Sequence, residues 1–353
     1  MNKLTKVGCS ALCGSLAAVS AANAGTLSVT GGADLTFTSL SKQTVGQPIG
    51  MGSNINFKGS GELENGWTYD LTIAHANANA FSAANITLDM QGFGKLNFNQ
   101  GNSGNGIQAM DDKMPTAWEE TWGAGLSGGV KLVTGSGPSQ NVMYTTPTMV
   151  GTTMTFTYAH EAGQTDNNDK GTKSADNGQE RAYDVTINVN PALGTEILSG
   201  LNLFAGASTI ESRENNAAVD QDQYQGVGGI TYDIGPLSLG TQWSAVYTGV
   251  DDKVGTIVAD YHTYKNHAFG IAFNVNDDLS VSYGEHTSRK AGYNNSAAQS
   301  GAPGSRLVEV SSWQAAYTMG GASFRLADVN VNNNLFSAGS ERSATVVSLG
   351  LAF

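Results

Sequence analysis

The closing segment of the chain constrains the fold most, because its side chains alternate strictly between two sets. One set is threonine and apolar: Thr345, Val347, Leu349, Leu351 and Phe353. The other set is shorter: Ala344, Val346, Ser348, Gly350 and Ala352. Residues two apart share one face of a strand, so the first set forms an apolar face that ends in an aromatic ring. A soluble sheet needs a second layer over such a face. In a transmembrane β-barrel lipid covers it, and aromatic rings lie at the interface.

The first 24 residues predict a secretory signal peptide that is removed from the mature protein. Lys3 and Lys6 form a short basic region, residues 7–22 are apolar or small, and Ala22-Asn23-Ala24 has the small-x-small form of a cleavage site. The alternative is an N-terminal membrane anchor, which a short core rich in Gly, Ala and Ser disfavours. Both cysteines, Cys9 and Cys13, lie in this segment, so we expect the mature chain, residues 25–353, to contain no thiol.

The composition excludes several classes of protein. Glycine is abundant at 45 residues, proline is scarce at 7, and only 14% of the residues are charged. The mean hydropathy is −0.21, and the mature chain lacks the run of about eighteen apolar residues that a membrane-spanning helix needs. The formal net charge of −12 becomes −14 once Lys3 and Lys6 leave with the signal peptide. Such acidity disfavours nucleic acid as a partner and favours cations.

Segments of alternating polarity recur along the whole mature chain. Between residues 183 and 190 the apolar set is Tyr183, Val185, Ile187 and Val189, and the polar set is Asp184, Thr186, Asn188 and Asn190. Segments of the same kind cover residues 27–38, 67–74, 85–91, 154–160, 237–247 and 279–284. Repeated period-two patterning of this kind predicts an all-β fold, a transmembrane antiparallel β-barrel of about sixteen strands.

The connections between these segments alternate between short turns and long polar loops. The short turns are expected at residues 64–66, 92–94, 233–236, 276–278 and 319–321. The long loops are expected at residues 41–52, 101–137, 163–180, 215–221, 250–261, 291–305 and 332–341. Short turns on one rim and long loops on the other are typical of outer-membrane barrels, and a soluble β-sandwich does not alternate in this way. Residues 190–200 fit poorly, because they are too many for a short turn.

Three segments, taken in order, resemble the general porins of Gram-negative bacteria. The first segment, Ser53-Asn-Ile-Asn-Phe-Lys-Gly-Ser-Gly-Glu-Leu-Glu-Asn-Gly-Trp67, resembles the second strand and first turn of the family. The second, Gly92-Phe-Gly-Lys-Leu-Asn-Phe98, resembles its second turn and fifth strand. The third, Tyr144-Thr145-Thr146-Pro147 followed by Gly151, is similar to its sixth strand and turn. The terminal Phe353 resembles the closing residue of outer-membrane proteins, which the barrel assembly machinery reads. The resemblance implies a sixteen-stranded homotrimer in outer-membrane lipid, whose third long loop folds into the lumen.

The cationic side chains depart from the family pattern. Porins of this family often carry arginine near the start of strand two and just after strand five, where this chain holds Asn54 and Gln100, and residues 140–143 also lack it. Strand parity still directs five cations into the lumen, and we expect them to form the basic side of the pore wall: Lys58, Lys95, Arg306, Arg325 and Arg342.

The third long loop, residues 101–137, is the main candidate for a functional segment. It carries Asp111, Asp112, Lys113, Glu119 and Glu120. A loop of this length and position is expected to enter the lumen, where its carboxylates would face the basic wall across a transverse field. The alternative is a solvated surface loop with ordinary charges. Trp118 and Trp122 are four residues apart, a spacing that suits a short helical turn.

The expected function is a water-filled channel for passive diffusion of small hydrophilic solutes and ions, with a preference for cations. Two alternatives stay open, a substrate-selective channel and a non-conducting structural or adhesive barrel. None of the five histidines lies in an HExxH pattern, so we expect no enzyme, metal centre or cofactor. The acidic segment 166–171 departs from the spacing of an EF-hand, which favours a solvated loop over a calcium site.

Overall fold

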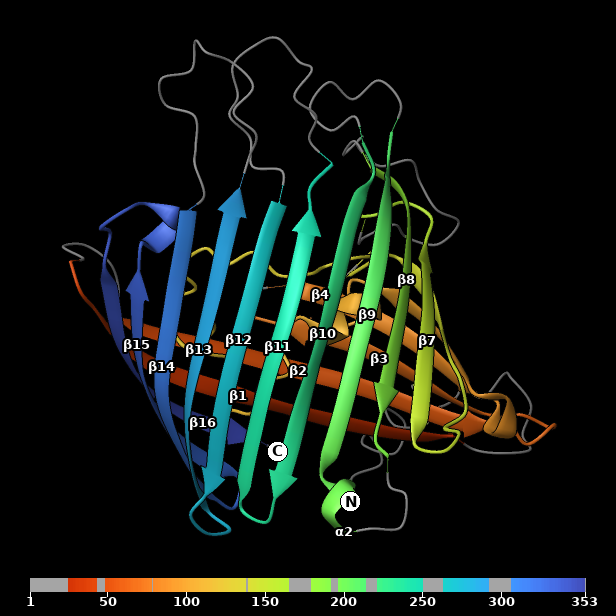
Figure 1. Cartoon of the computed structure of the whole chain (residues 1–353). Coiled ribbons are helices and arrows are strands. Elements are labelled where there is room, and N and C mark those ends of the chain that lie inside the picture. Colours follow the sequence, from red (N-terminus) through yellow and green to blue (C-terminus); the bar gives the residue numbers. More distant parts are fainter. Residues whose placement is uncertain are drawn as a thin grey trace, which may run out of the picture.

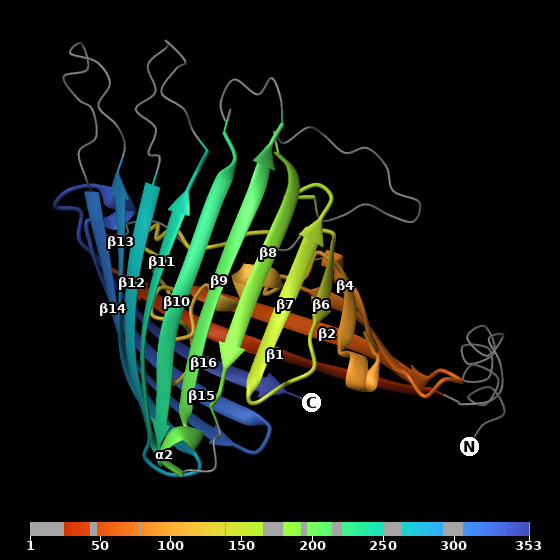
Figure 2. The same cartoon turned by 45° about the vertical axis from the view of Figure 1, so that its right-hand side comes forward.

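The protein folds into a closed β-barrel of sixteen antiparallel strands (Figures 1 and 2). The computed structural model describes residues 25–42, 48–77, 79–137, 139–164, 179–191, 196–213, 221–249, 263–291 and 306–352. The strands are β1 (Thr26–Leu40), β2 (Ile49–Glu62), β3 (Thr68–Ala76), β4 (Asn79–Asp89), β5 (Lys95–Gln100), β6 (Asn141–Thr145), β7 (Thr152–Ala159), β8 (Gln179–Val189), β9 (Leu201–Ser212), β10 (Gln223–Ile234), β11 (Leu237–Tyr247), β12 (Thr263–Asn274), β13 (Leu279–Ala291), β14 (Arg306–Met319), β15 (Ala322–Asn332) and β16 (Arg342–Ala352). The predicted fold class is confirmed. The signal-peptide residues 1–24 and Phe353 lie outside the described residues.

The first and last strands close the barrel. β1 pairs with β16 in antiparallel register from Gly32 opposite Ala352 to Leu40 opposite Ala344. On its other side β1 pairs with β2, from Thr26 opposite Ser60 to Phe37 opposite Ile49. The alternating segment at the end of the chain is therefore the seam of the barrel, as its sequence predicts. Closure gives each described strand a hydrogen-bonded neighbour on both sides, as the core of a bilayer requires.

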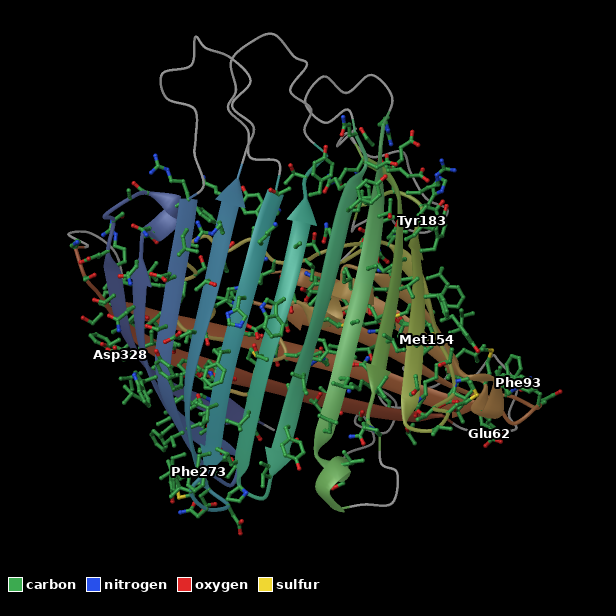
Figure 3. The ribbon with its side chains drawn as sticks, viewed as in Figure 1. Glu62, Phe93, Met154, Tyr183, Phe273 and Asp328 are labelled. Carbon is green, nitrogen blue, oxygen red and sulfur yellow. The ribbon has the colours of Figure 1, made fainter. Side chains whose placement is uncertain are left out.

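The two faces of the wall differ in polarity, as the period-two pattern predicts. The outer face exposes large apolar side chains such as Phe37, Trp243 and Val347. In Figure 3, Tyr183 and Phe273 lie on this outer surface, and both are more than 40% exposed. The inner face of the same strands carries buried polar side chains, among them Gln242 and Gln314. An apolar exterior that needs no covering layer within the chain suits a wall surrounded by lipid.

The connections confirm the predicted alternation with two differences. Short turns join β2 to β3, β4 to β5, β10 to β11, β12 to β13 and β14 to β15. The poorly fitting connection after β8 holds a helical turn, α2 (Glu196–Ser199), which accounts for its length. On the opposite rim, β3 ends at Ala76 and β4 begins at Asn79, so one connection on the long-loop side is short. Within the described residues, no helix combines the length and apolar character needed to cross a bilayer.

The outer face predicts a side-specific response to charge. We expect Phe269→Arg, on the outer face of β12, to destabilise the barrel by about 2–4 kcal/mol, because the guanidinium would lie in lipid. The matched change Thr30→Arg places the same group on the exposed inner face of β1 and is expected to leave stability nearly unchanged. Unfolding by denaturant in lipid vesicles measures both, and equal losses would contradict the assigned faces.

Candidate functional site

The segment between β5 and β6 lies inside the barrel and follows its inner wall. Its backbone N–H groups donate to buried side chains of strands distant in sequence: Lys113 to Gln242 Oε1 at 3.1 Å, Glu119 to Gln314 Oε1 at 3.0 Å, and Thr134 to Gln225 Oε1 at 2.7 Å. The loop contains one short 3₁₀ helix, η2 (Gly106–Met110). Trp122 lies in a single hydrogen-bonded turn, in which the N–H groups of Gly123 and Ala124 donate to the carbonyl of Glu120 at 2.8 and 3.3 Å, whereas Trp118 lies in a bend before it.

Glutamine side chains dock the loop because an amide can donate and accept at once. Gln242 also donates through Nε2 to the carbonyl oxygens of Met110 at 3.1 Å and Asp111 at 2.7 Å. Gln314 donates in the same way to the carbonyl of Glu119 at 2.8 Å. An extended loop in the lumen has no ladder partner, and these amides satisfy backbone groups that burial would otherwise leave unpaired. Sequence reasoning missed them, because they look like any polar residue on an inner face.

Two apolar clusters fasten the loop further. In the first, Ile107, Met110, Met114 and Val133 of the loop pack against four inner-wall residues: Phe204, Val227, Val246 and Ala268. In the second, Ala124 of the loop joins a patch on β14 to β16 that includes Val308, Val310, Val329, Val331 and Val346. The loop therefore covers the inner wall from β8 to β16. The inner faces of β1 and β2 stay exposed at Ser28, Thr30, Asn54 and Lys58, which leaves polar wall in contact with water.

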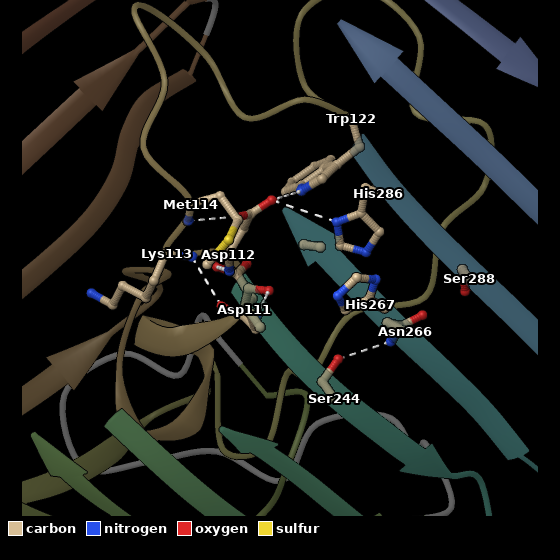
Figure 4. A network of polar contacts seen from close by, with 12 residues as sticks. Asp111, Asp112, Lys113, Met114, Trp122, Ser244, Asn266, His267, His286 and Ser288 are labelled. Carbon is tan, nitrogen blue, oxygen red and sulfur yellow. Dashed lines mark hydrogen bonds and ion pairs between the residues drawn. The ribbon is translucent and has the colours of Figure 1, made fainter. Parts of the chain in front are cut away.

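Asp112 is buried in the contact between loop and wall (Figure 4). Its carboxylate accepts hydrogen bonds from Trp122 Nε1 at 3.0 Å and from the Met114 N–H at 2.9 Å. The Nδ1 atom of His286, on the inner face of β13, lies 3.6 Å away, and both side chains are at most 2% exposed. Asp112 thus helps to attach the loop and does not face the open lumen.

The other charged residues of the loop are more accessible. Asp111, Glu119 and Glu120 are partly exposed, and Lys113 is exposed. Burial raises the pKa of Asp111 to about 6, with smaller contributions from the nearby carboxylates of Asp112 and Glu120. Burial, together with the neighbouring Glu120 carboxylate, also raises the pKa of Glu119.

The five cations expected on the pore wall all lie on the inner face of the strands, but they do not form a free basic row. Lys95 Nζ pairs with Asp89 Oδ2 at 3.0 Å, and Arg325 with Asp34 Oδ1 at 2.7 Å. Arg342 donates to the carbonyl oxygens of Ser41 at 3.3 Å and Lys42 at 3.2 Å. Lys58 and Arg306 are exposed. Two of the five cations are thus paired with wall carboxylates, and Arg342 is held by the backbone that follows β1.

A lipid-compatible barrel with an exposed polar lumen and a loop docked inside it defines a channel protein of outer membranes. A family model described as Gram-negative porin matches residues 8–302. The chain belongs to this family of channels for passive diffusion and resides in the outer membrane. No curated protein matches the chain in sequence.

Solved porin structures share the fold at low sequence identity. OmpF of Salmonella typhi, solved with daunomycin, is 13% identical with a TM-score of 0.65, and the match covers 94% of this chain and 98% of that one. An anion-selective porin of Comamonas acidovorans is 13% identical with a TM-score of 0.61, covering 93% of this chain and 100% of that one. The trimer form of OmpT of Vibrio cholerae is 11% identical with a TM-score of 0.62, covering 94% and 100%. At this identity the likeness shows the fold alone.

The raised pKa of Asp111 predicts a pH-dependent ion preference. Since this pKa is about 6, the carboxyl is mostly ionised at pH 7 and mostly protonated at pH 5. We expect the zero-current potential in a salt gradient to shift toward anions as the pH falls through this range, because negative charge leaves the loop. The shift should be smaller in Asp111→Asn, and the same pH dependence in both proteins would contradict the assignment.

Proposed function

We propose that this porin conducts small hydrophilic solutes and ions with a preference for cations. The observation that carries the proposal is the negative net charge of the loop that lies in the lumen. The loop offers three partly exposed carboxylates, Asp111, Glu119 and Glu120. Two of the wall cations, Lys95 and Arg325, are neutralised by wall carboxylates. The loop as a whole carries four carboxylates against two lysines, Lys113 and Lys131, so its own net charge is negative.

Carboxylates at the rim of a narrow passage act strongly on passing ions. Field lines concentrate between low-dielectric walls, which raises the local concentration of cations and repels anions. The effect weakens as the Debye length falls to about 3 Å near 1 M salt. We assign this role to Asp111, Glu119 and Glu120, with Lys113 as a local counter-charge, whereas Asp112 holds the loop in place. Lys58, Arg306 and Arg342 remain as the basic part of the wall, since the carbonyl partners of Arg342 leave its charge in place.

The exposed inner faces of β1 and β2 favour an open channel over a barrel plugged by its own loop. Ser28, Thr30 and Asn54 offer hydroxyl and amide groups that hydrogen-bond to water and to hydrophilic solutes. Passage of this kind follows concentration gradients and requires no chemical step, so the proposal assigns no catalytic residue. A steady open current in single-channel recordings is expected, and its absence would favour the plugged barrel.

Neutralising the loop carboxylates tests the ion preference. We expect Asp111→Asn, Glu119→Gln and Glu120→Gln, combined in one protein, to shift the zero-current potential in a salt gradient toward anions. The control neutralises Asp166, Asp169 and Asp176 of the next loop, which lie outside the described residues, and is expected to shift it less. Wild-type preference for anions, or equal shifts in the two variants, would overturn the proposal.

A homotrimer is the expected assembly. One neighbour in fold, OmpT of Vibrio cholerae, is described in a trimer form. The outer faces of β1 and β2 carry the small residues Gly31, Ala33 and Gly59, and an added Cβ at Gly59 would meet no atom of its own chain within 4 Å. Unheated detergent gels should give a band near three times the 36.6 kDa of the full chain, less its signal peptide. Cross-linking that yields only monomer would contradict it.

Phe353 is proposed as an assembly signal for the barrel assembly machinery. It follows the seam strand β16, whose pairing with β1 closes the wall. We expect deletion of Phe353 to lower the amount of folded protein in the outer membrane while leaving the conductance of the molecules that do form unchanged. Quantitative gels of membrane fractions measure the yield, and normal levels in the deletion variant would refute the role.

A further inference from the structure

A single carboxylate on the inner wall contacts both ends of the inserted loop. Asp184 lies on the inner face of β8 and is 1% exposed. At the start of the loop the Ile107 N–H donates to Asp184 Oδ2 at 3.1 Å. At its end the Ser136 N–H lies 3.1 Å from both carboxylate oxygens, and Ser136 Oγ donates to Oδ2 at 2.5 Å. These contacts bring the two stems of the loop together on one strand.

Both stems approach Asp184 through a glycine that directly precedes the donor. Gly106 and Gly135 have φ angles of 57° and 49°, a region that L side chains rarely adopt. An added Cβ at Gly106 would lie 1.9 Å from Asp184 Oδ2. At Gly135 it would lie 2.4 Å from Ile107 Cγ2 of the other stem and 2.6 Å from Asp184 Oδ1. The same Gly–donor pair thus occurs once in each stem, which marks a site shaped around the carboxylate.

The charge of Asp184 makes the contact costly to lose. Within the described part of the chain, no Lys, Arg or His forms an ion pair with Asp184, so N–H and O–H donors alone stabilise it. Hydrogen bonds to a buried charged group contribute more than neutral ones, and buried donors left without an acceptor are expensive. The uncharged side chain of Gln225 differs from Asp184 in the stems that it binds. Among the described residues, it accepts hydrogen bonds from one stem, from the N–H groups of Thr134 and Gly135.

We propose that Asp184 is a positioning residue for the inserted loop. By binding both stems it closes the neck of the loop, which is the point where the two stems meet, and thereby fixes the width of the channel. With both stems tied to β8, the segment between them is a closed loop whose carboxylates keep a set distance from the exposed wall of β1 and β2. The fixed width rests on the proposed channel function, whereas the contact of both stems with Asp184 is independent of it.

Hydrogen–deuterium exchange of the detergent-solubilised protein tests the neck directly. In Asp184→Ala we expect amide exchange in peptides covering residues 101–110 and 131–140 to quicken together, by about tenfold or more. The matched control Gln225→Ala should quicken exchange only in 131–140. Unchanged exchange in 101–110 of Asp184→Ala, or a pattern equal to that of Gln225→Ala, would overturn the proposal.

Two milder variants keep the test decisive if Asp184→Ala does not form a barrel. Asp184→Asn keeps one acceptor oxygen and should rescue part of the protection in both stems. Gly135→Ala leaves the carboxylate intact but forces a methyl group against it and against Ile107 of the other stem, so both stems should again exchange faster. Wild-type exchange in both variants would refute the role of Asp184.

Single-channel recording reports the consequence for the pore. Asp184→Ala should show a noisier open current with several conductance levels. The control Asp70→Ala removes an exposed inner-face carboxylate of β3, for which the described residues show no loop contact, and should keep a single level. A wild-type current in Asp184→Ala would refute the link to channel width. If the wild-type protein carried no current, the channel function would fail, and the exchange data would still decide the neck.

Discussion

The pairing of β1 with β16 is the constraint on which the rest of the structure depends. In a bilayer core every backbone N–H and C=O needs a partner within the protein, and only a closed sheet supplies one for each strand. Closure also fixes the parity of every residue in the wall. The same register that exposes Phe37 and Val347 to lipid turns Asp34 and Ser348 inward. The pairing of β1 with β16 therefore determines which of their side chains line the lumen.

Inside the wall, the loop is held by a second principle, the satisfaction of backbone groups by side chains. Gln242 and Gln314 act on its extended stretches as a neighbouring strand would, and Asp184 acts on its two stems. Apolar packing of Ile107, Met110 and Met114 then removes water from the same contact. Since polar and apolar contacts coincide along the loop, its position is set by many coupled interactions rather than by one.

The barrel could be predicted from the sequence because a strand between lipid and lumen alternates apolar and polar side chains. This alternation is visible within a single segment, such as residues 183–190. Entry of the loop into the lumen followed from its length and from the resemblance to porins. The details of the site were not predictable, because they depend on which wall positions the barrel brings opposite the loop. Asp34 and Arg325 pair across 291 positions of sequence. In the sequence, Asp112 and Glu119 are both simply carboxylates of the same loop. In the structure, His286 and Trp122 surround Asp112, whereas Glu119 is partly exposed.

The order of the anchors along the chain has a consequence for biogenesis. Asp184, Gln225, Gln242 and Gln314 all follow the loop in sequence, on strands β8 to β14. The docking surface of the loop exists only once these strands have paired, and contacts of such high sequence separation are slow to form. We therefore expect the loop to dock after this part of the wall has formed. The lumen is then expected to reach its final width in two steps, first by closure of the wall and afterwards by docking of the loop.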